Sequence, residues 1–243
     1  MNKQHTTIKQ RKTTVLLIFT IFLTLASCTE GEYPGPLATE ERVLSAFDGV
    51  HVESIGNVNL HVAQEYRVVI RTNANVLDDI ILTVNDEKLY INLTGRHKKI
   101  DKLEFDIYAP EYTAITLDGV ADIRSHDLLA TDELWIEQDG VGNIYLAEVD
   151  VQLISFRLDE VGNVDVQGTA DEILAVHSGV GNLQLFDLSA RKGDVSLSGT
   201  GNIDVNVTDQ LKIDLSGVGD IRYMGNPSMT VNHTGVGKII RVN

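Results

Sequence analysis

A six-residue phrase, typified by Asp139-Gly-Val-Gly-Asn-Ile, recurs through residues 118–239 at nearly constant intervals. Its fifth position is Asn or Asp in every copy but the last, and it returns after 21, 20, 19, 20, 18 and 18 residues. The seven residues at this position are Asp122, Asn143, Asn163, Asn182, Asn202, Asp220 and Lys238. A fixed period of about 20 residues is typical of stacked repeat proteins, in which each unit buries its apolar side against its neighbours.

The columns that flank this position predict which side chains face the core. The residue after it is always apolar: Ile123, Ile144, Val164, Leu183, Ile203, Ile221 and Ile239. The second residue before it is almost always valine: Val120, Val141, Val161, Val180, Thr200, Val218 and Val236. The seventh residue before it is also apolar: Ile115, Ile136, Phe156, Ala175, Val195, Ile213 and Val231. We expect these three columns to point inward. The position directly after Ile115 and its equivalents is mostly polar, and we expect it to face solvent.

This alternation of apolar and polar positions predicts an all-β fold. Its two-residue period is that of β-strands, and the inward residues are mainly Val, Ile and Leu, which favour strands. A unit of short strands and glycine-containing bends indicates one coil of a parallel β-helix with about 20 residues per coil. Because successive coils stack about 4.8 Å apart, residues 113–243 would form a rod of six to seven coils about 30 Å long.

The Gly-Val-Gly-Asn phrase is predicted to form a corner of each coil. Glycine permits positive φ and a close approach of backbones, and Asn and Asp tolerate the left-handed region. Stacked at one corner, four asparagines would form an amide ladder: Asn143, Asn163, Asn182 and Asn202. The sequence leaves open whether these corners bind ions, although their period excludes the nine-residue calcium-binding repeat.

The first 27 residues have the pattern of a lipoprotein signal peptide. They carry four basic and no acidic residues, and the apolar stretch 15–26 is too short for a membrane-spanning helix. Residues 25–28, Leu-Ala-Ser-Cys, resemble the lipobox of bacterial lipoproteins, so Cys28 is the predicted lipidation site and membrane anchor. An ordinary signal peptide is the alternative. Residues 28–41, polar with Pro and Gly, are predicted to be a flexible tether.

Residues 42–243 are the predicted folded domain, with regular repeats over 113–243. Residues 42–112 lack the regular glycine corners but contain alternating segments. The expected strands lie within 51–62, 66–71, 89–93 and 103–110, with a hairpin turn at 85–88. We predict that 42–112 forms the cap and first coils of the same solenoid, because an open end would expose strand edges. A separate small β-sandwich is the alternative.

The charge and cysteine content narrow the classes of partner. Without residues 1–27, the chain has 16 basic and 35 acidic residues, a net charge of −19. Such a chain lacks the phosphate-neutralising surface that nucleic-acid binding needs. Anionic lipid headgroups would repel it, so a lipid anchor is required to hold it on a membrane. The single cysteine excludes disulfides within the chain.

No motif for a catalytic nucleophile, a metal site or a phosphate-binding loop occurs, so we predict a non-enzymatic protein without a cofactor or metal. The outward column two residues after the Asn/Asp position is the candidate binding row. It comprises Arg124, Tyr145, Asp165, Gln184, Asp204 and Arg222, of which all but Gln184 are predicted binding residues. Asp165 and Asp204 would lie about 9.6 Å apart. This separation keeps a polysaccharide-active enzyme open as an alternative.

The repeated Gly-x-Gly-Asn-Ile phrase, together with the opening residues 47–60, resembles the head GIN domain family of auto-transporter adhesins. The resemblance spans residues 44–241, and departures at Ala121, Glu160 and Lys238 predict irregular or capping coils. It implies a right-handed parallel β-helix exported as an outer-membrane lipoprotein of a Gram-negative bacterium, on the cell surface or the periplasmic face. It implies adhesion only as a label, since the family offers no ligand residues to carry over. The predicted glycan or protein partner follows instead from the lipobox, the tether, the repeat and the absence of a catalytic motif. A structural lipoprotein that faces the periplasm is the alternative, and the oligomeric state stays open.

Overall fold

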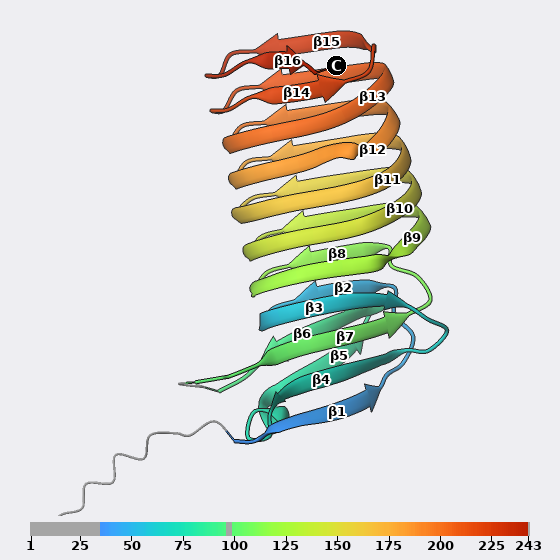
Figure 1. Ribbon diagram of the computed structural model, residues 1–243, viewed down its shortest axis with the longest axis vertical. Helices are drawn as coiled ribbons and strands as arrows, with labels where there is room; N and C mark the ends of the chain where they lie inside the picture. Colours follow the sequence, from blue (N-terminus) through green and yellow to red (C-terminus); the bar gives the residue numbers. More distant parts are fainter. Residues whose placement is uncertain (1–34, 96–98, 243) are drawn as a thin grey trace, which may run out of the picture. The chain divides into compact units, whose positions relative to one another are not determined.

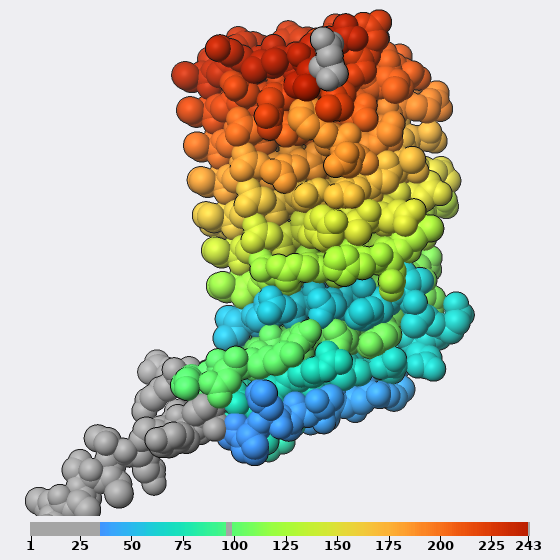
Figure 2. All heavy atoms as spheres, in the orientation of Figure 1, coloured from blue at the N-terminus to red at the C-terminus, as the bar shows by residue number. Residues whose placement is uncertain are grey.

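The computed structural model describes residues 35–95 and 99–242, which all belong to one compact unit, Glu32–Asn243. In this unit the strands stack as successive coils along one axis (Figure 1). The atoms of each coil pack directly against those of the next (Figure 2). The predicted signal peptide, Cys28 and the first part of the predicted tether lie outside the described residues. Within these residues, no helix has the length and hydropathy that crossing a membrane requires.

The regular coils are built from five long strands. These are β9 (Val120–Gln138), β10 (Val141–Leu158), β11 (Val161–His177), β12 (Val180–Leu197) and β13 (Thr200–Leu215). Neighbouring strands pair in parallel with equivalent repeat positions opposite each other, as Asn163 lies opposite both Asn143 and Asn182. Each strand bends between the two faces of the coil at a register shift, in β10 between Leu146 and Val149. The predicted all-β parallel β-helix with coils of about 20 residues is confirmed.

The coils continue beyond β13 in three short strands. They are β14 (Ile221–Met224), β15 (Ser228–His233) and β16 (Ile239–Arg241). Strands β14 and β15 pair with the two halves of β13, and β16 pairs with β14. On the β15 face no further strand follows among the described residues, and Val231 is 47% exposed. Val231 lies opposite the buried Ile213 and so points to the predicted side, but it is not part of the core, because no further coil covers it.

The N-terminal strands extend both faces of the coils. They are β1 (Leu37–Val43), β2 (Gly49–Val52), β3 (Ile55–Val62), β4 (Arg67–Asn73), β5 (Ile80–Asn85), β6 (Lys88–Leu93), β7 (Leu103–Ala109) and β8 (Ala114–Leu117), with a 3-10 turn at Leu77–Asp79. One face continues in the order β1-β4-β7-β3-β9. The other face continues in the order β5-β6-β2-β8-β9. Strands β1, β4 and β7 pair antiparallel, as do β5 and β6.

Strand β1 begins inside the segment that the sequence predicts to be a tether. Leu37 pairs with Asn73, and the guanidinium of Arg42 donates hydrogen bonds to the carbonyls of Ile80 and Leu77 at 2.6 and 2.9 Å. The prediction that the tether extends to residue 41 is therefore wrong for its last five residues. These residues alternate in exposure as an edge strand does, and backbone pairing with β4 holds them.

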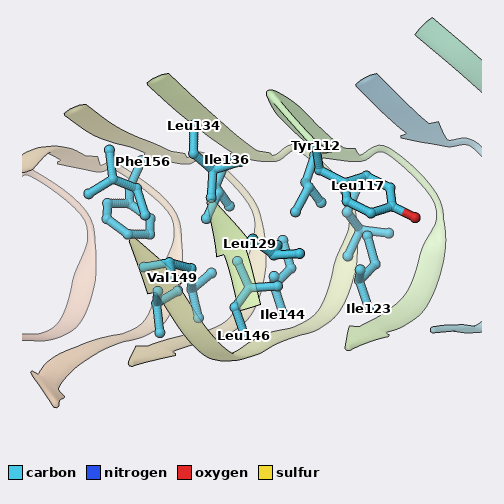
Figure 3. Close-up of a cluster of buried hydrophobic side chains, with 14 of the residues drawn as sticks. Tyr112, Leu117, Ile123, Leu129, Leu134, Ile136, Ile144, Leu146, Val149 and Phe156 are labelled. Atoms are coloured by element: carbon cyan, nitrogen blue, oxygen red, sulfur yellow. The ribbon is translucent and has the colours of Figure 1, made fainter. Parts of the chain in front are cut away.

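The core lies between the two faces of each coil (Figure 3). The column that follows the Asn/Asp position is buried from Ile123 to Ile221, and the column seven before it is buried from Ile115 to Ile213. Figure 3 shows Ile123 and Ile144 from the first face pointing toward Ile136 and Phe156 from the second. Both columns are confirmed as core over these coils.

The valine column of the Gly-Val-Gly-Asn phrase is not part of the core. Its valines are 45–70% exposed: Val120, Val141, Val161, Val180, Val218 and Val236. In β10, Val141 begins the strand and alternates with Gly142, so it points to the same side as Asn143 and away from the buried Ile144. The predicted inward orientation is wrong because strand alternation runs through the corner.

Candidate binding surfaces

The repeated asparagines lie beside each other on the outside of one corner and are joined by hydrogen bonds. Asn163 Nδ2 donates to Asn143 Oδ1 at 3.0 Å, and Asn182 Nδ2 donates to Asn163 Oδ1 at 2.9 Å. Asn202 Nδ2 donates to Asn182 Oδ1 at 2.9 Å. Each of these three acceptor oxygens also receives the backbone N–H of the next coil, at 3.1–3.2 Å. The amide groups therefore bind each other and the backbone, and they tie consecutive coils together.

Aspartates accept hydrogen bonds at both ends of this row of amides. Asp122 Oδ1 accepts the side-chain and backbone N–H of Asn143 at 2.9 and 3.0 Å, and its Oδ2 lies 2.9 Å from Arg124. Partial burial disfavours the charged form of Asp122, but the hydrogen bonds from Asn143 and Arg124 outweigh burial and lower its pKa. At the other end, the N–H of Lys238 donates to Asp220 at 2.8 Å. Acceptor-only carboxylates thus complete the hydrogen bonding where the amides stop.

The predicted binding row follows one register line along the same face. Arg124 lies opposite Tyr145, Tyr145 opposite Asp165, Asp165 opposite Gln184, Gln184 opposite Asp204 and Asp204 opposite Arg222. The structure therefore brings all six side chains onto adjacent strands. Gln184 is exposed, and the other members except Asp204 are half-buried.

Two members of the row neutralise each other. The guanidinium of Arg222 donates to both carboxylate oxygens of Asp204, at 2.6 and 2.5 Å, and it lies 5.6 Å from the ring centre of Phe186. Asp204 is 5% exposed, and its burial outweighs the Arg222 contacts and raises its pKa. Because both oxygens are engaged, the pair of Asp165 and Asp204 does not offer two free carboxylates to a substrate.

The middle of the row is more open. Burial, together with the nearby carboxylate of Asp187, raises the pKa of Asp165. Gln167 Nε2 donates a long hydrogen bond of 3.5 Å to the Tyr145 hydroxyl, and His126 lies against the Tyr145 ring at 5.9 Å between centres. This part of the row can offer an aromatic ring and polar groups to a partner.

A second surface, a shallow groove on the opposite face of the coils, was not predicted. Three adjoining hollows of about 630, 540 and 430 Å³ share lining residues and cross β9, β10 and β11. The residues shared between neighbouring hollows are Thr131, Asp132, Glu133, Gln152, Leu153 and Asp171. Arg191 and Lys192 line the end of the groove on β12. The groove therefore runs across successive coils, along their stacking direction.

Trp135 is the principal apolar side chain of this groove. It is the single tryptophan of the chain, and 43% of it is exposed. The outward neighbour of Trp135 on β10 is the small Ser155, and Leu174 on β11, also outward, is 37% exposed. Trp135 alternates with the buried Leu134 and Ile136, and this sequence pattern could have predicted that Trp135 faces outward. The depth of the groove depends on neighbouring coils, so the sequence pattern does not show it.

Carboxylates line the whole groove, and basic groups lie only at its end on β12. Glu111, Asp132 and Asp150 line one hollow, whereas Arg191 and Lys192 share another with Asp171, which lies 3.6 Å from Arg191. Gln152 Nε2 donates to Asp132 at 2.7 Å, and Thr169 donates to Asp150 at 2.9 Å. The groove thus presents an exposed aromatic ring beside oriented oxygen acceptors and amide donors. Such a combination suits a ligand with many hydroxyl groups.

Solved structures of several bacterial proteins share this architecture. A "putative adhesin" from Bacteroides fragilis is 27% identical, with a TM-score of 0.84 and coverage of 86% of this chain and 99% of the other. A "putative adhesin" from Parabacteroides merdae is 19% identical, with a TM-score of 0.68 over 86% and 97%. A "putative lipid binding protein" from Parabacteroides distasonis is 21% identical, with a TM-score of 0.69 over 86% and 98%. The last two likenesses support the fold alone.

The family comparison agrees with the repeat that carries the fold. No curated protein is similar to the chain at a significant level. The sequence profile described as "Putative auto-transporter adhesin, head GIN domain" matches residues 46–227, which include the N-terminal strands from β2 onward and the regular coils through β14. Because this match spans most of the chain, the protein belongs to the head GIN domain family of auto-transporter adhesins.

Proposed function

We propose that this protein is a lipid-anchored, non-catalytic adhesin of the cell envelope whose coils bind a glycan. Its family and the adhesin from Bacteroides fragilis support a binding role at the bacterial surface or envelope. The observation that carries the proposal is the groove across β9–β11 with the exposed Trp135. An extended groove on stacked coils suits an extended ligand, because each coil offers similar positions along the axis.

The groove chemistry favours a neutral polysaccharide over an anionic one. Aromatic rings provide a large contact area for the C–H face of a sugar ring, and Trp135 is positioned for this role. Carboxylates and amides such as Asp132 and Gln152 can accept and donate hydrogen bonds to sugar hydroxyls. The carboxylates that line the groove outnumber its basic groups and would repel uronate or sulfate groups. We therefore propose a neutral glycan as the ligand class.

The anchor is part of the same proposal. Cys28, in a lipobox-like sequence, would carry the lipid, and the following residues up to β1 would separate the coils from the outer membrane of a Gram-negative bacterium. The periplasmic structural lipoprotein remains the competing proposal, and it predicts protection from external protease.

The decisive experiment uses the intrinsic fluorescence of the full chain in detergent. Because Trp135 is the single tryptophan, its emission reports on the groove directly. Soluble fragments of β-glucan, mannan and galactan would be titrated, with polygalacturonate as the anionic comparison. We expect a neutral glycan to shift the emission to shorter wavelength and Trp135→Ala to abolish binding measured by calorimetry.

A matched variant separates the groove from the predicted row. Replacing Arg124 and Tyr145 together by alanine leaves the groove intact and should leave glycan affinity unchanged. If instead that double variant loses binding and Trp135→Ala retains it, the ligand lies on the row. If no glycan changes Trp135 emission, or Trp135→Ala binds as well as the unaltered protein, the groove proposal is wrong. Cleavage of any fragment during the titration would contradict a non-catalytic role.

A further inference from the structure

A histidine and two carboxylates meet where β2 lies beside β8. His51 Nε2 lies 3.5 Å from Glu53 Oε1 and 3.6 Å from Asp118 Oδ2, and one ligand atom from each side chain falls within 4.8 Å of the others. The backbone joins these segments, since the N–H of Asp118 donates to the carbonyl of Val52 at 2.9 Å. This cluster shares no residue with the groove or the binding row.

The Nε2 atom of His51 is buried and makes no hydrogen bond. Its separations from the two carboxylate oxygens exceed the 2.7–3.2 Å range of N–H···O hydrogen bonds. A buried polar atom without a partner is costly in a folded protein. Hydrogen bonding therefore does not explain why these side chains lie together. The two carboxylates beside the imidazole nitrogen favour a bound cation instead.

The two separations from His51 Nε2 match the edges of a zinc coordination sphere. Zinc binds histidine nitrogen and carboxylate oxygen at about 2.0–2.2 Å in a tetrahedral arrangement, which puts neighbouring ligand atoms about 3.4 Å apart. We propose that His51 Nε2, Glu53 and Asp118 bind one Zn²⁺ ion, with a fourth position open to water or an external donor. This donor set, one imidazole nitrogen and two carboxylate oxygens, is suited to a borderline divalent transition metal.

Neighbouring side chains orient two of the proposed ligands. Asn92 Nδ2 donates to Glu53 Oε2 at 2.8 Å, which leaves Oε1 directed at His51. The Tyr90 ring stacks on the His51 imidazole with centres 5.1 Å apart. Asn92 and Tyr90 lie on β6, which pairs with β2, so the adjacent strand holds the ligands in place. Asn92 is thus a positioning residue of the site.

In a second histidine cluster, around His61, an arginine side chain takes the place that a metal ion would have. His61 lies 3.6 Å from Asp106, but Asp106 is also contacted by the guanidinium of Arg71 and accepts Asn59 Nδ2 at 2.8 Å. Arg71 therefore already supplies the positive charge there. Across the described ranges 35–95 and 99–242, the recorded ion pairs of Glu53 and Asp118 involve only His51.

The sequence motifs do not show this site because its ligands are far apart along the chain. His51 and Glu53 are alternate residues at the end of β2 and just after it, whereas Asp118 follows β8 in the next layer of the same face. A metal at this position would link the N-terminal strands to the first regular coil. Metal binding would therefore stabilise the junction between them.

Cobalt provides a direct test, because tetrahedral Co²⁺ with nitrogen and oxygen ligands absorbs visible light much more strongly than hydrated Co²⁺. The full chain in detergent, first treated with a chelator, would be titrated with Co²⁺ and then with Zn²⁺. We expect one equivalent of cobalt to give tetrahedral absorption, one equivalent of zinc to remove it, and zinc to raise the midpoint of thermal unfolding.

Variants assign the ligands. His51→Ala should abolish the cobalt absorption, the near-isosteric Asp118→Asn should weaken zinc binding at least about tenfold, and Asn92→Ala should weaken it by about 10–100-fold. His126→Ala, at an exposed histidine of β9, is the matched control and should bind as the unaltered chain does. Circular dichroism of each variant would show whether its coils are intact, and Asp118→Asn preserves shape if His51→Ala does not fold.

Two results would overturn the metal site. In one, the folded, unaltered chain gives no tetrahedral cobalt spectrum and no zinc-dependent change in thermal stability, which would show that the cluster binds no metal. In the other, His51→Ala and Asp118→Asn both retain one equivalent with unchanged affinity, which would place the metal elsewhere.

Discussion

At the residue scale, the corner glycines are required by the close stacking of coils. Gly201 has φ of +149°, and a Cβ built on it would lie 1.5 Å from the carbonyl oxygen of Gly181 in the preceding coil. Gly162 repeats the pattern, with 1.7 Å to the oxygen of Gly142. No rotation of a side chain relieves a clash between Cβ and backbone. The glycine of each repeat therefore permits the backbone hydrogen bonds between coils.

Substituting Gly201 should be far more destabilising than substituting a strand glycine of the same sheet. We expect Gly201→Ala to lower the free energy of unfolding by about 3 kcal/mol or more, because backbone strain and a steric clash combine. Gly193→Ala is the control: its Cβ would lie 3.1 Å from methyl groups of Leu211 and Val207, which can adjust. We expect it to lower stability by no more than about 1 kcal/mol. Urea unfolding of both variants checks this, and equal losses would contradict the stacking argument.

Two aspartates of the same face affect stability in opposite directions. Despite partial burial, hydrogen bonds from Asn143 and Arg124 lower the pKa of Asp122, so the folded state favours its charged form. Burial and the charge of Asp187 raise the pKa of Asp165, so the folded state disfavours its charged form. The ionised Asp122 therefore adds stability above the pKa of the unfolded chain, near 4, whereas the ionised Asp165 removes stability at neutral pH.

Replacement of each aspartate by asparagine should show these opposite signs. We expect Asp122→Asn to lower the urea midpoint at pH 7, and this loss should shrink as pH falls through the lowered pKa of Asp122. We expect Asp165→Asn to raise the midpoint at pH 7, with the gain disappearing at acidic pH, where Asp165 is protonated in both states. Urea unfolding from pH 7 down to pH 3 tests both. Shifts of the same sign at pH 7 would contradict this account.

At the element scale, side-chain amides reinforce the pairing of consecutive long strands. Asn163 of β11 takes part in three side-chain hydrogen bonds, donating to Asn143 of β10 and accepting the side chain and backbone of Asn182 of β12. These bonds run in the same direction as those of the backbone. The corner is thus held by side chains where glycine flexibility would otherwise weaken it.

Removal of one amide should loosen two interfaces between coils. We expect Asn163→Ala to lower the free energy of unfolding by about 1–3 kcal/mol, because the backbone N–H of Asn182 and the amide of Asn143 lose partners. Gln184→Ala, at an exposed position of the same face, is the control and should change stability by less than about 0.5 kcal/mol. Thermal or urea unfolding measures both. A neutral Asn163→Ala would show that water replaces the amide without loss.

At the scale of the whole molecule, an acidic chain needs a specific means of staying on a membrane. The chain has a net charge of −15 and one cysteine, Cys28. Negative charge opposes adsorption to anionic lipid, whereas two or more acyl chains give stable anchoring. The proposed location therefore depends on Cys28 rather than on the surface of the coils.

Replacement of Cys28 by serine should release the protein from membranes. We expect Cys28→Ser to move most of the protein from the membrane fraction to the soluble fraction and to abolish metabolic labelling with a fatty-acid analogue. Cell fractionation and labelling measure this, and retention of Cys28→Ser on membranes would contradict the anchor. Protease treatment of intact cells, with lysed cells as the control, then distinguishes an adhesin on the surface from a lipoprotein that faces the periplasm.

The repeat alone was enough to predict the coils. Residues that stack on copies of themselves, such as Asn143 on Asn163, impose the same local conformation at every period, so the sequence contains the register directly. The core columns of Ile144 and Phe156 followed from strand alternation. The valine column was misassigned because Val141 and Ile144 are three residues apart, and an extended strand places residues at that spacing on opposite sides.

Other features were decided only by the tertiary structure. The pairing of Arg222 with Asp204, the groove around Trp135 and the cluster of His51 and Asp118 all join side chains from different coils or distant segments. The strand at Leu37 likewise depends on a partner strand that lies about thirty residues further along the chain. Local sequence specifies the conformation of each coil because equivalent residues repeat. Contacts between non-equivalent residues depend instead on how the coils stack and on how the irregular N-terminal strands pair with them.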